Sequence, residues 1–227
     1  TIMSGHPPLR GVQLVLGTLA VSSATFMTVL DGSIANVSIP AIAGDIGVSP
    51  AQGTWVITAF GVSNAISVPL AGWMTRRFGQ IRLMVFLMLM FVGCSLLCGL
   101  AGSTAVLLGG RVLQGIGGAM IFATGIAILT TVYAPQERGR VLGLSVSAVY
   151  LGLTLGPFIG GALTEHLGWR SIFLALAPPG VAALICAVLC IKDDRLTREA
   201  GAFDLAGAAI YALSLPLLIF GLSRLPG

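Results

Sequence analysis

The sequence predicts an all-α integral membrane protein, and three observations lead to that fold class. Hydrophobic residues make up 56% of the 227 positions and charged residues only 9%, whereas a soluble domain is about one-quarter charged. The apolar residues form runs of about 20, the length that an α-helix needs to cross a bilayer. Apolar and polar residues do not alternate with a period of two, which excludes a β-barrel. This composition excludes a soluble enzyme, a disordered segment and a DNA-binding domain.

Seven candidate spans lie between charged and turn-forming segments. They fall near residues 12–39, 52–74, 82–101, 104–131, 140–163, 170–191 and 205–223. Residues 1–11 are expected to form a cytoplasmic N-terminus, and residues 192–203 a charged cytoplasmic linker. The first six spans, within residues 12–191, are expected to form one bundle, with residues 204–227 as an additional transmembrane helix.

The basic residues predict the orientation of these spans. If the N-terminus is cytoplasmic, nine of the twelve basic residues lie on the cytoplasmic side: Arg10, Arg76, Arg77, Arg82, Arg138, Arg140, Lys192, Arg195 and Arg198. The positive-inside rule therefore predicts a cytoplasmic N-terminus. The net charge of +4 does not indicate a nucleic-acid partner, because the basic residues fall in short loops rather than on one face.

An internal repeat links the second and fifth spans. PLAGWMTRRFGQIR (69–82) and PFIGGALTEHLGWR (157–170) share a Pro-x-x-Gly start, a bend containing glycine and an aromatic residue, and a final arginine. One loop faces inward and the other outward, so the repeat has inverted topology. Three-plus-three inverted repeats are typical of secondary transporter halves. Chance similarity between two glycine-rich helix ends is the alternative.

Two ionisable residues stand alone inside predicted spans. Asp31 and Arg111 both fall about 10–13 Å below the outer surface at 1.5 Å per helical residue. Charges at this depth survive only with a partner or a water-filled cavity. The two residues could therefore pair or line one cavity, and protonation of Asp31 is a candidate step for proton coupling. The alternative is a fixed ion pair that only holds two helices together.

Two amide side chains accompany these charges. Gln114 follows Arg111 by three residues, on the same face of the predicted helix. Asn36 lies five residues after Asp31, about 140° around the helix, and the spacing leaves open whether it shares the face. Neither a metal-binding cluster nor a phosphate-binding Gly-Lys loop is found in the sequence, so we expect no metal, no cofactor and no enzyme activity.

Five segments in order resemble the major facilitator superfamily, and within it the EmrB/QacA-type 14-helix drug:proton antiporters. The segments are LDGSIANVSIP (30–40), GWMTRRFGQIRL (72–83), LLGGRVLQGIGGAM (107–120), GLTLGPFIGGAL (152–163) and WRSIFLALAPPG (169–180). The resemblance implies a six-helix N-terminal bundle with a 3+3 inverted repeat, plus one additional helix. It also implies that the C-terminal bundle is missing from this sequence, which begins at Thr1, so the chain alone is expected not to transport.

The resemblance further implies roles for individual residues. Asp31 and Arg111 would serve proton coupling, and Asn36 and Gln114 would line the substrate cavity. In the fifth span, the antiporter motif would gate the cavity through Gly152, Gly156, Pro157, Gly160 and Gly161. Three of these glycines are spaced by four residues and stack on one helix face, where they permit close helix contact. Ordinary small-residue packing is the alternative.

The loop after the second span carries the superfamily's cytoplasmic motif through Gly72, Arg76, Arg77, Gly79 and Arg82. It departs from the family pattern at Arg76, where an acidic residue is usual. Arg76 or Arg77 is instead expected to meet Glu137. The alternative is that these basic residues only set topology and contact anionic lipid.

The implied function is proton-coupled efflux of amphiphilic drugs or toxic compounds across the cell inner membrane. Its partners are membrane lipid, a small amphiphilic substrate and protons, and in a Gram-negative host also a periplasmic adaptor and an outer-membrane channel. One alternative is export of another solute, such as a fatty acid, a siderophore or a metabolite. The other is a seven-span sensor, which the five motifs disfavour. An apolar cavity wall could be formed by Phe26, Met27, Trp55, Phe60, Met120 and Phe122. Methionine and phenylalanine on membrane helices more often face lipid or core, so none of the six is assigned as a substrate contact.

Overall fold

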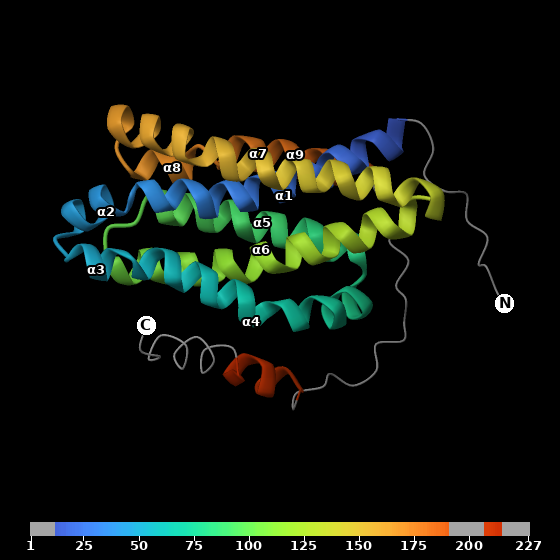
Figure 1. The fold of residues 1–227 in the computed structure, drawn as a ribbon, viewed down its shortest axis with the longest axis horizontal. Helices are drawn as coiled ribbons and strands as arrows, with labels where there is room; N and C mark the ends of the chain where they lie inside the picture. The colour runs from blue at the N-terminus through green and yellow to red at the C-terminus, as the bar shows by residue number, and fades with distance from the viewer. Residues whose placement is uncertain (1–11, 191–206, 215–227) are drawn as a thin grey trace, which may run out of the picture.

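The computed structural model describes residues 12–190 and 207–214, and nearly all of them are helical (Figure 1). The helices are α1 (Val12–Val37), α2 (Ile39–Ile46), α3 (Pro50–Gly53), α4 (Trp55–Phe78), α5 (Gln80–Gly99), α6 (Thr104–Val132), α7 (Pro135–Leu167), α8 (Arg170–Leu174) and α9 (Ala177–Cys190). Six helical segments in this part of the chain are long and apolar enough to cross a membrane. The predicted all-α membrane fold is confirmed.

The six predicted spans of the bundle each have a counterpart in the structure. The predicted N-terminus (1–11) and linker (192–203) lie outside the described residues. Of the predicted seventh helix (204–227), residues 207–214 are described and helical. The sixth span is divided into α8 and α9, with two prolines, Pro178 and Pro179, at the start of α9. Proline lacks a backbone donor and disfavours helix in the residue before it, which explains the break.

Several helices extend beyond their predicted limits. The second span was expected to end at residue 74, but α4 continues to Phe78 and carries Arg76 and Arg77 in its last turn. The fifth span was expected to begin at residue 140, but α7 begins at Pro135 with Glu137 in its first turn. Basic groups at a helix C-terminus and acidic groups at an N-terminus complement the helix dipole. Charged residues here lengthen the helices instead of ending them.

The predicted inverted repeat is visible in the geometry. Pro69 lies inside α4 and Pro157 inside α7, and each helix ends at a glycine with positive φ, Gly79 at 87° and Gly168 at 80°. The two turns lie at opposite ends of the bundle (Figure 1). Because only glycine adopts this conformation without strain, both turns depend on it.

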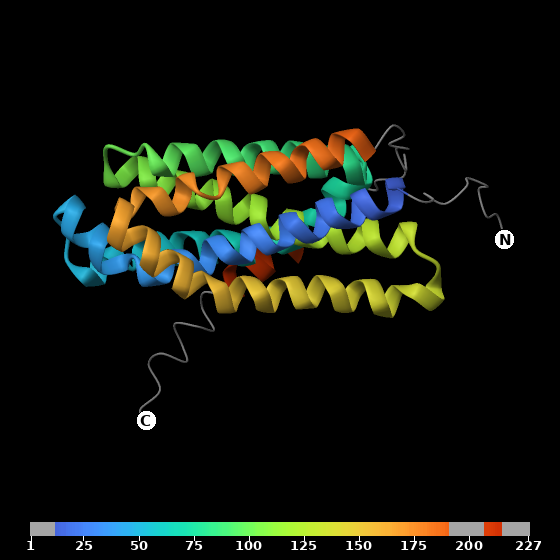
Figure 2. The ribbon, with the colours of Figure 1, turned by 90° about the horizontal axis from the view of Figure 1, so that it is seen from above.

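The two repeats interlock. The first repeat contains α1, α4 and α5, and the second contains α6, α7 and α9. The first helix of each repeat packs most extensively on the second helix of the other, so α1 lies along α7 and α6 along α4 (Figures 1 and 2). This exchange is symmetric, as expected for two halves related by a two-fold axis in the membrane plane.

The charges divide between the two ends of the bundle. Arginines of the α4–α5 and α6–α7 connections gather at one end: Arg76, Arg77, Arg82, Arg138 and Arg140. The other end carries Arg170, Asp45 and Glu165. Within the described residues, no ion pair joins Arg76 or Arg77 to Glu137, so that expected contact is wrong in this structure.

Candidate functional site

The two lone membrane charges meet inside the bundle. Nη1 of Arg111 in α6 donates a hydrogen bond to Oδ2 of Asp31 in α1 at 2.6 Å, and neither side chain has any exposed surface. The sequence left open whether the two would pair or line one cavity, and in the structure they pair. Since a buried charge without a partner is strongly unfavourable, each ion permits the burial of the other.

Arg111 is held from several sides. Its Nη1 also donates to Oε1 of Gln114 at 3.0 Å, and its Nε donates to the carbonyl oxygen of Val56 at 3.3 Å. Its guanidinium carbon lies 4.3 Å from the ring centre of Phe60 and 5.5 Å from that of Phe173. Such cation–π contacts are strongest where water is excluded. The cation therefore joins α6 to α1, α4 and α8.

A second layer of polar groups fixes Gln114. Its Nε2 donates to Oγ of Ser95 at 3.0 Å, and the thiol of Cys98 donates to its Oε1 at 3.5 Å. All three side chains are buried. Ser95 and Cys98 belong to α5, so the network extends the ion pair to a further helix. Fixed in this way, the Gln114 carboxamide positions the guanidinium of Arg111.

Two glycines of α6 bring the neighbouring helices close enough for this network. A Cβ on Gly110 would lie 2.5 Å from Sγ of Cys98, and one on Gly115 would overlap the carbonyl oxygen of Phe60. Side chains larger than hydrogen would therefore push α5 or α4 away from Arg111. Small residues at membrane helix interfaces commonly serve close approach.

The ion pair leaves some hydrogen-bonding capacity unused. Oδ1 of Asp31 and Nη2 of Arg111 are both buried and make no hydrogen bond within the described part of the chain. Buried polar atoms of this kind are costly in a low-polarity interior. Oδ1 is accordingly an oxygen that can take a proton without first breaking the bond between Oδ2 and Nη1.

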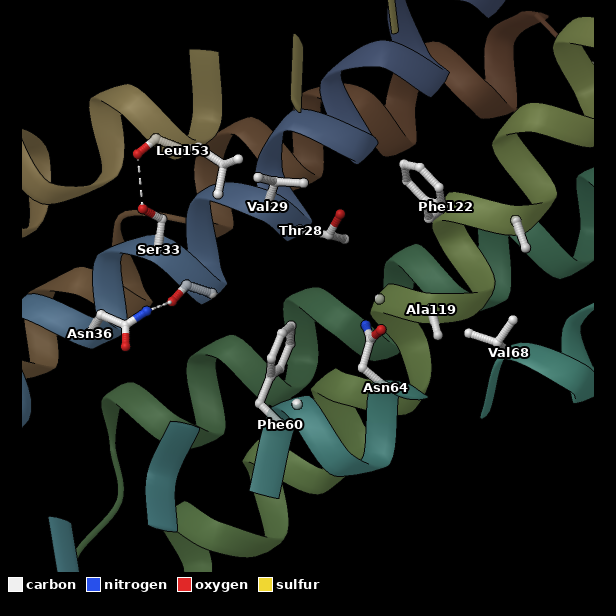
Figure 3. A pocket seen from close by; sticks show the side chains of 14 residues that line it. Thr28, Val29, Ser33, Asn36, Phe60, Asn64, Val68, Ala119, Phe122 and Leu153 are labelled. Atoms are coloured by element: carbon white, nitrogen blue, oxygen red, sulfur yellow. Dashed lines mark hydrogen bonds between the residues drawn. The ribbon is translucent and has the colours of Figure 1, made fainter. Parts of the chain in front are cut away.

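A cavity of about 420 Å³ lies beside the ion pair, among α1, α4, α6 and α7 (Figure 3). This volume is in the range of sites for drug-sized molecules, roughly 300–1,000 Å³. Its polar lining includes Thr28, Ser33, Asn36 and Asn64, and its apolar lining includes Val29, Phe60, Val68, Phe122 and Leu153. Neither Asp31 nor Arg111 lines it.

The structure separates the two amides that the sequence assigned to the cavity. Asn36 is exposed, lines the cavity and donates from Nδ2 to the carbonyl of Gly32 at 3.1 Å. Gln114 is fully buried in the ion-pair network and does not line the cavity. Asn36 and Asp31 therefore occupy different faces of α1, which settles the question that their spacing left open.

Sequence reasoning missed several side chains of the site. Phe60 and Phe122 line the cavity, although their residue type favoured lipid or core. Ser95, Cys98 and Phe173 surround the ion pair and were not recognised either. One signal was available for Cys98. It lies three residues after Ser95 inside an apolar run, so the two side chains fall on the same face of the helix.

The glycine motif of α7 forms a close seam with α1. A Cβ on Gly156 would lie 2.5 Å from Cβ of Ser33, one on Gly160 would lie 2.8 Å from the carbonyl oxygen of Ile34, and one on Gly152 would lie 3.1 Å from that of Phe26. Gly161 has no atom within 4 Å of such a position. The predicted stacking of three glycines on one face is present, and Gly161 points elsewhere.

Hydrogen bonds cross the same seam. Oγ of Ser33 donates to the carbonyl of Leu153 at 3.1 Å, and the hydroxyls of Ser38 and Thr164 lie 2.7 Å apart. Leu153 precedes Pro157 by four residues, and a proline leaves the carbonyl four residues earlier without its helical donor. The hydroxyl of Ser33 therefore supplies the hydrogen bond that Pro157 removes, and it ties α7 to the helix that carries Asp31.

The residues of the motif that follows the second span surround one tight turn. Gly79 makes the turn between α4 and α5, and Arg76, Arg77 and Arg82 are exposed around it. Gly72 lies two turns earlier on α4, where a Cβ would meet Nη1 of Arg76 at 3.7 Å, an ordinary contact distance. The motif therefore lies at the opposite end of the molecule from Asp45 and Arg170 (Figure 1).

A second aspartate–arginine pair lies at that opposite end. Oδ2 of Asp45 in α2 accepts hydrogen bonds from Nη1 of Arg170 at 2.6 Å and from Nε1 of Trp169 at 3.0 Å. Arg170 also donates to the carbonyl of Ala101 at 3.2 Å, and its guanidinium lies 4.4 Å from the Trp169 ring centre. These bonds, chiefly that from Arg170, hold the pKa of Asp45 below its usual value. The cluster joins three connections at this end.

An inverted-repeat helix bundle with a buried ion pair beside a cavity is the architecture of one half of a secondary transporter. The chain belongs to the Major Facilitator Superfamily, whose sequence profile matches residues 21–223.

Individual relatives agree with this assignment. The chain is 44% identical over 214 residues to a multidrug export protein, EmrB of Haemophilus influenzae, covering 93% of this chain and 42% of the relative. It is 40% identical over 176 residues to the fatty acid resistance protein FarB of Neisseria gonorrhoeae, covering 78% and 35%. The chain thus spans less than half the length of these relatives.

A solved structure agrees on the fold. A peptide transporter, POT, crystallised as an E310Q mutant with alafosfalin, superposes with a TM-score of 0.72 over 96% of this chain and 48% of that one. The sequence identity is 18%, so this likeness concerns the fold alone.

Proposed function

We propose that the chain is the N-terminal half of a proton-coupled exporter of amphiphilic compounds in the cell inner membrane. The carrying observation is the Asp31–Arg111 pair, which has no exposed surface and lies next to a cavity of drug-like size. The similarity to a protein named for multidrug export supports the choice of substrate class. The arginines at the α4–α5 and α6–α7 end support a cytoplasmic N-terminus, because that end would face the cytoplasm.

In this mechanism Asp31 carries the proton. Protonation of the carboxylate removes the charge that attracts Arg111, so the 2.6 Å bond between α1 and α6 weakens. Helix α1 is then held mainly by its seam with α7, where Gly152, Gly156 and Gly160 permit close contact. A change in how α1 lies against α6 alters the cavity that both helices line. The second bundle of the full transporter would complete this cavity and rock against the first.

The chain offers a matched pair of variants for the test. Asp31→Asn removes the buried carboxylate, and Asp45→Asn removes a carboxylate that forms an equally short bond to arginine outside the cavity. Both are introduced into the full reading frame that includes the second bundle. The purified transporters are then reconstituted in liposomes under an imposed pH gradient.

We expect Asp31→Asn to reduce gradient-driven transport of a lipophilic cation such as ethidium to background, with binding of the cation retained. Asp45→Asn should keep most of the transport. Unchanged gradient-driven transport in a folded Asp31→Asn protein would contradict the proposed role of Asp31 as the proton carrier.

A second substrate class is supported by one observation. The relative FarB is named for fatty acid resistance, and the cavity wall contains enough apolar side chains to hold an acyl chain. Competition separates the two proposals: a medium-chain fatty acid that displaces ethidium from the reconstituted transporter would indicate export of fatty acids. In a Gram-negative host we also expect a periplasmic adaptor and an outer-membrane channel, which co-purification from mildly solubilised membranes would test.

A further inference from the structure

One face of α4 connects the cavity with the ion pair. Val56, Phe60, Asn64 and Val68 are spaced by four residues, so their side chains follow one stripe along the helix. The carbonyl of Val56 contacts Arg111, while Asn64 and Val68 line the cavity. Phe60 does both, because its ring centre lies 4.3 Å from the guanidinium carbon of Arg111 and its side chain lines the cavity.

The ring of Phe60 occupies a slot between two glycines. A Cβ on Gly32 of α1 would lie 3.5 Å from Cε1 of the ring, and one on Gly118 of α6 would lie 3.6 Å from its Cζ. Both glycines also line the cavity, and Gly32 directly follows Asp31 in sequence. Figure 3 shows the ring directed from α4 into the space that faces α1. The ring therefore lies at the boundary between the cavity and the fully buried pair.

From this arrangement we infer that Phe60 is a gate. Its ring separates the cavity from Asp31, and a bulky amphiphilic occupant opens aqueous access to the carboxyl group by displacing the ring. The inference deepens the proposed function and rests on it. The proton then moves between the carboxyl oxygen of Asp31 and water in the cavity. Among the described residues of α1, α4 and α6, Asp31 is the one acidic residue, so it is the carboxylate that the gate controls.

Phe60 acts through Asp31, so it is a positioning residue, and its test must measure access to Asp31. A water-soluble carbodiimide with an added amine converts accessible carboxyl groups to amides, which peptide mass spectrometry quantifies. Asp45, whose side chain is 48% exposed, serves as an internal standard in every sample. The protein is the full-length transporter in detergent without substrate.

We expect Phe60→Leu to increase the labelling of Asp31 several-fold relative to that of Asp45. The separate variant Phe60→Tyr keeps the aromatic ring and should show the low wild-type rate of labelling. Phe122→Leu is the matched control, because Phe122 lines the same cavity but makes no ring contact with Arg111 within the described residues. It should weaken substrate binding and leave the labelling of Asp31 unchanged. If Phe60→Leu does not fold, Phe60→Met tests the same point.

If Asp31 is labelled at the wild-type rate in a folded Phe60→Leu or Phe60→Met protein, the inference that Phe60 is a gate is wrong. If neither variant folds, Phe60 has a structural role and the inference is likewise wrong. For displacement by an occupant, Phe60→Trp is titrated with tetraphenylphosphonium, and a shift in emission absent from the wild type is expected. If tetraphenylphosphonium binds and the emission does not shift, the inference that an occupant displaces the ring is wrong. These readouts do not measure transport, so they are separate from the Asp31→Asn test of the proposed function.

Discussion

The described part of the chain contains two aspartate–arginine pairs of the same geometry in different surroundings. In each, Nη1 of an arginine bonds Oδ2 of an aspartate at 2.6 Å, and each guanidinium also lies over an aromatic ring. Asp31 and Arg111 have no exposed surface, whereas the side chains of Asp45 and Arg170 are 48% and 43% exposed. Distance alone therefore does not determine what a pair contributes. Burial makes the first pair sensitive to the loss of one charge, while water screens the second.

The largest contrast is expected when each arginine is removed. Arg111→Ala leaves a carboxylate buried without its partner, which typically costs about 3–5 kcal/mol. We expect a strong loss of folded protein, measured by size-exclusion chromatography of a fluorescent fusion after heating in detergent. Arg170→Ala should lower the melting temperature only slightly. Equal losses from the two variants would show that burial does not distinguish the pairs.

A double variant sharpens this contrast. Asp31→Asn combined with Arg111→Gln replaces both charges by neutral amides that can still form a hydrogen bond. We expect much of the stability lost in Arg111→Ala to return while proton-coupled transport stays absent. Restored stability without transport would indicate that the two charges serve transport rather than folding.

A smaller effect is expected at the seam that positions the buried pair. Gly156→Leu forces a side chain into Ser33 of α1, and overpacking of this kind costs about 1–3 kcal/mol. We expect a lower melting temperature and reduced transport, because α1 carries Asp31. Gly161→Leu is the control on the same helix, since nothing lies within 4 Å of its Cβ position. Similar losses from both variants would argue against a special role for the seam.

The smallest effect concerns the exposed pair and its pH dependence. Because the pKa of Asp45 is lower in the folded protein than the usual value of 3.8, its contribution to stability is present above that value and is lost as the pH falls through the folded pKa. Asp45→Asn should therefore melt slightly below the wild type at neutral pH, with the difference disappearing in strong acid. A difference that grows on acidification would contradict the sign of this shift.

The sequence alone predicted the fold class, the six spans of the bundle and the inverted repeat. Each of these predictions rests on a local signal: the length of the apolar runs, the placement of the charges and the repeated Pro-x-x-Gly pattern. Such signals do not depend on how the helices pack. The boundaries were less accurate, because α4 and α7 include the charged residues that were expected to lie outside the spans. The short helices α2 and α3 were missed, since neither is long or apolar enough to give a span signal.

The candidate site was predictable only where a residue was chemically unusual for its place. Asp31 and Arg111 stood out because a charge in an apolar run requires an explanation. Phe60 and Cys98 resemble any other apolar residue of a membrane helix, and their contacts depend on how neighbouring helices rotate and cross. Gln114 illustrates the same limit, because its helix face was foreseen but the helix that covers that face was not.

The interlocked repeats also impose an order of assembly. Helix α1 packs chiefly on α7, which begins at Pro135, so it leaves the ribosome long before its main neighbour exists. Arg111 follows Asp31 by 80 residues, and at typical synthesis rates that separation amounts to about 4–16 s. During that interval Asp31 has no counter-ion from α6, so the buried pair can form only after helices from both repeats have been made.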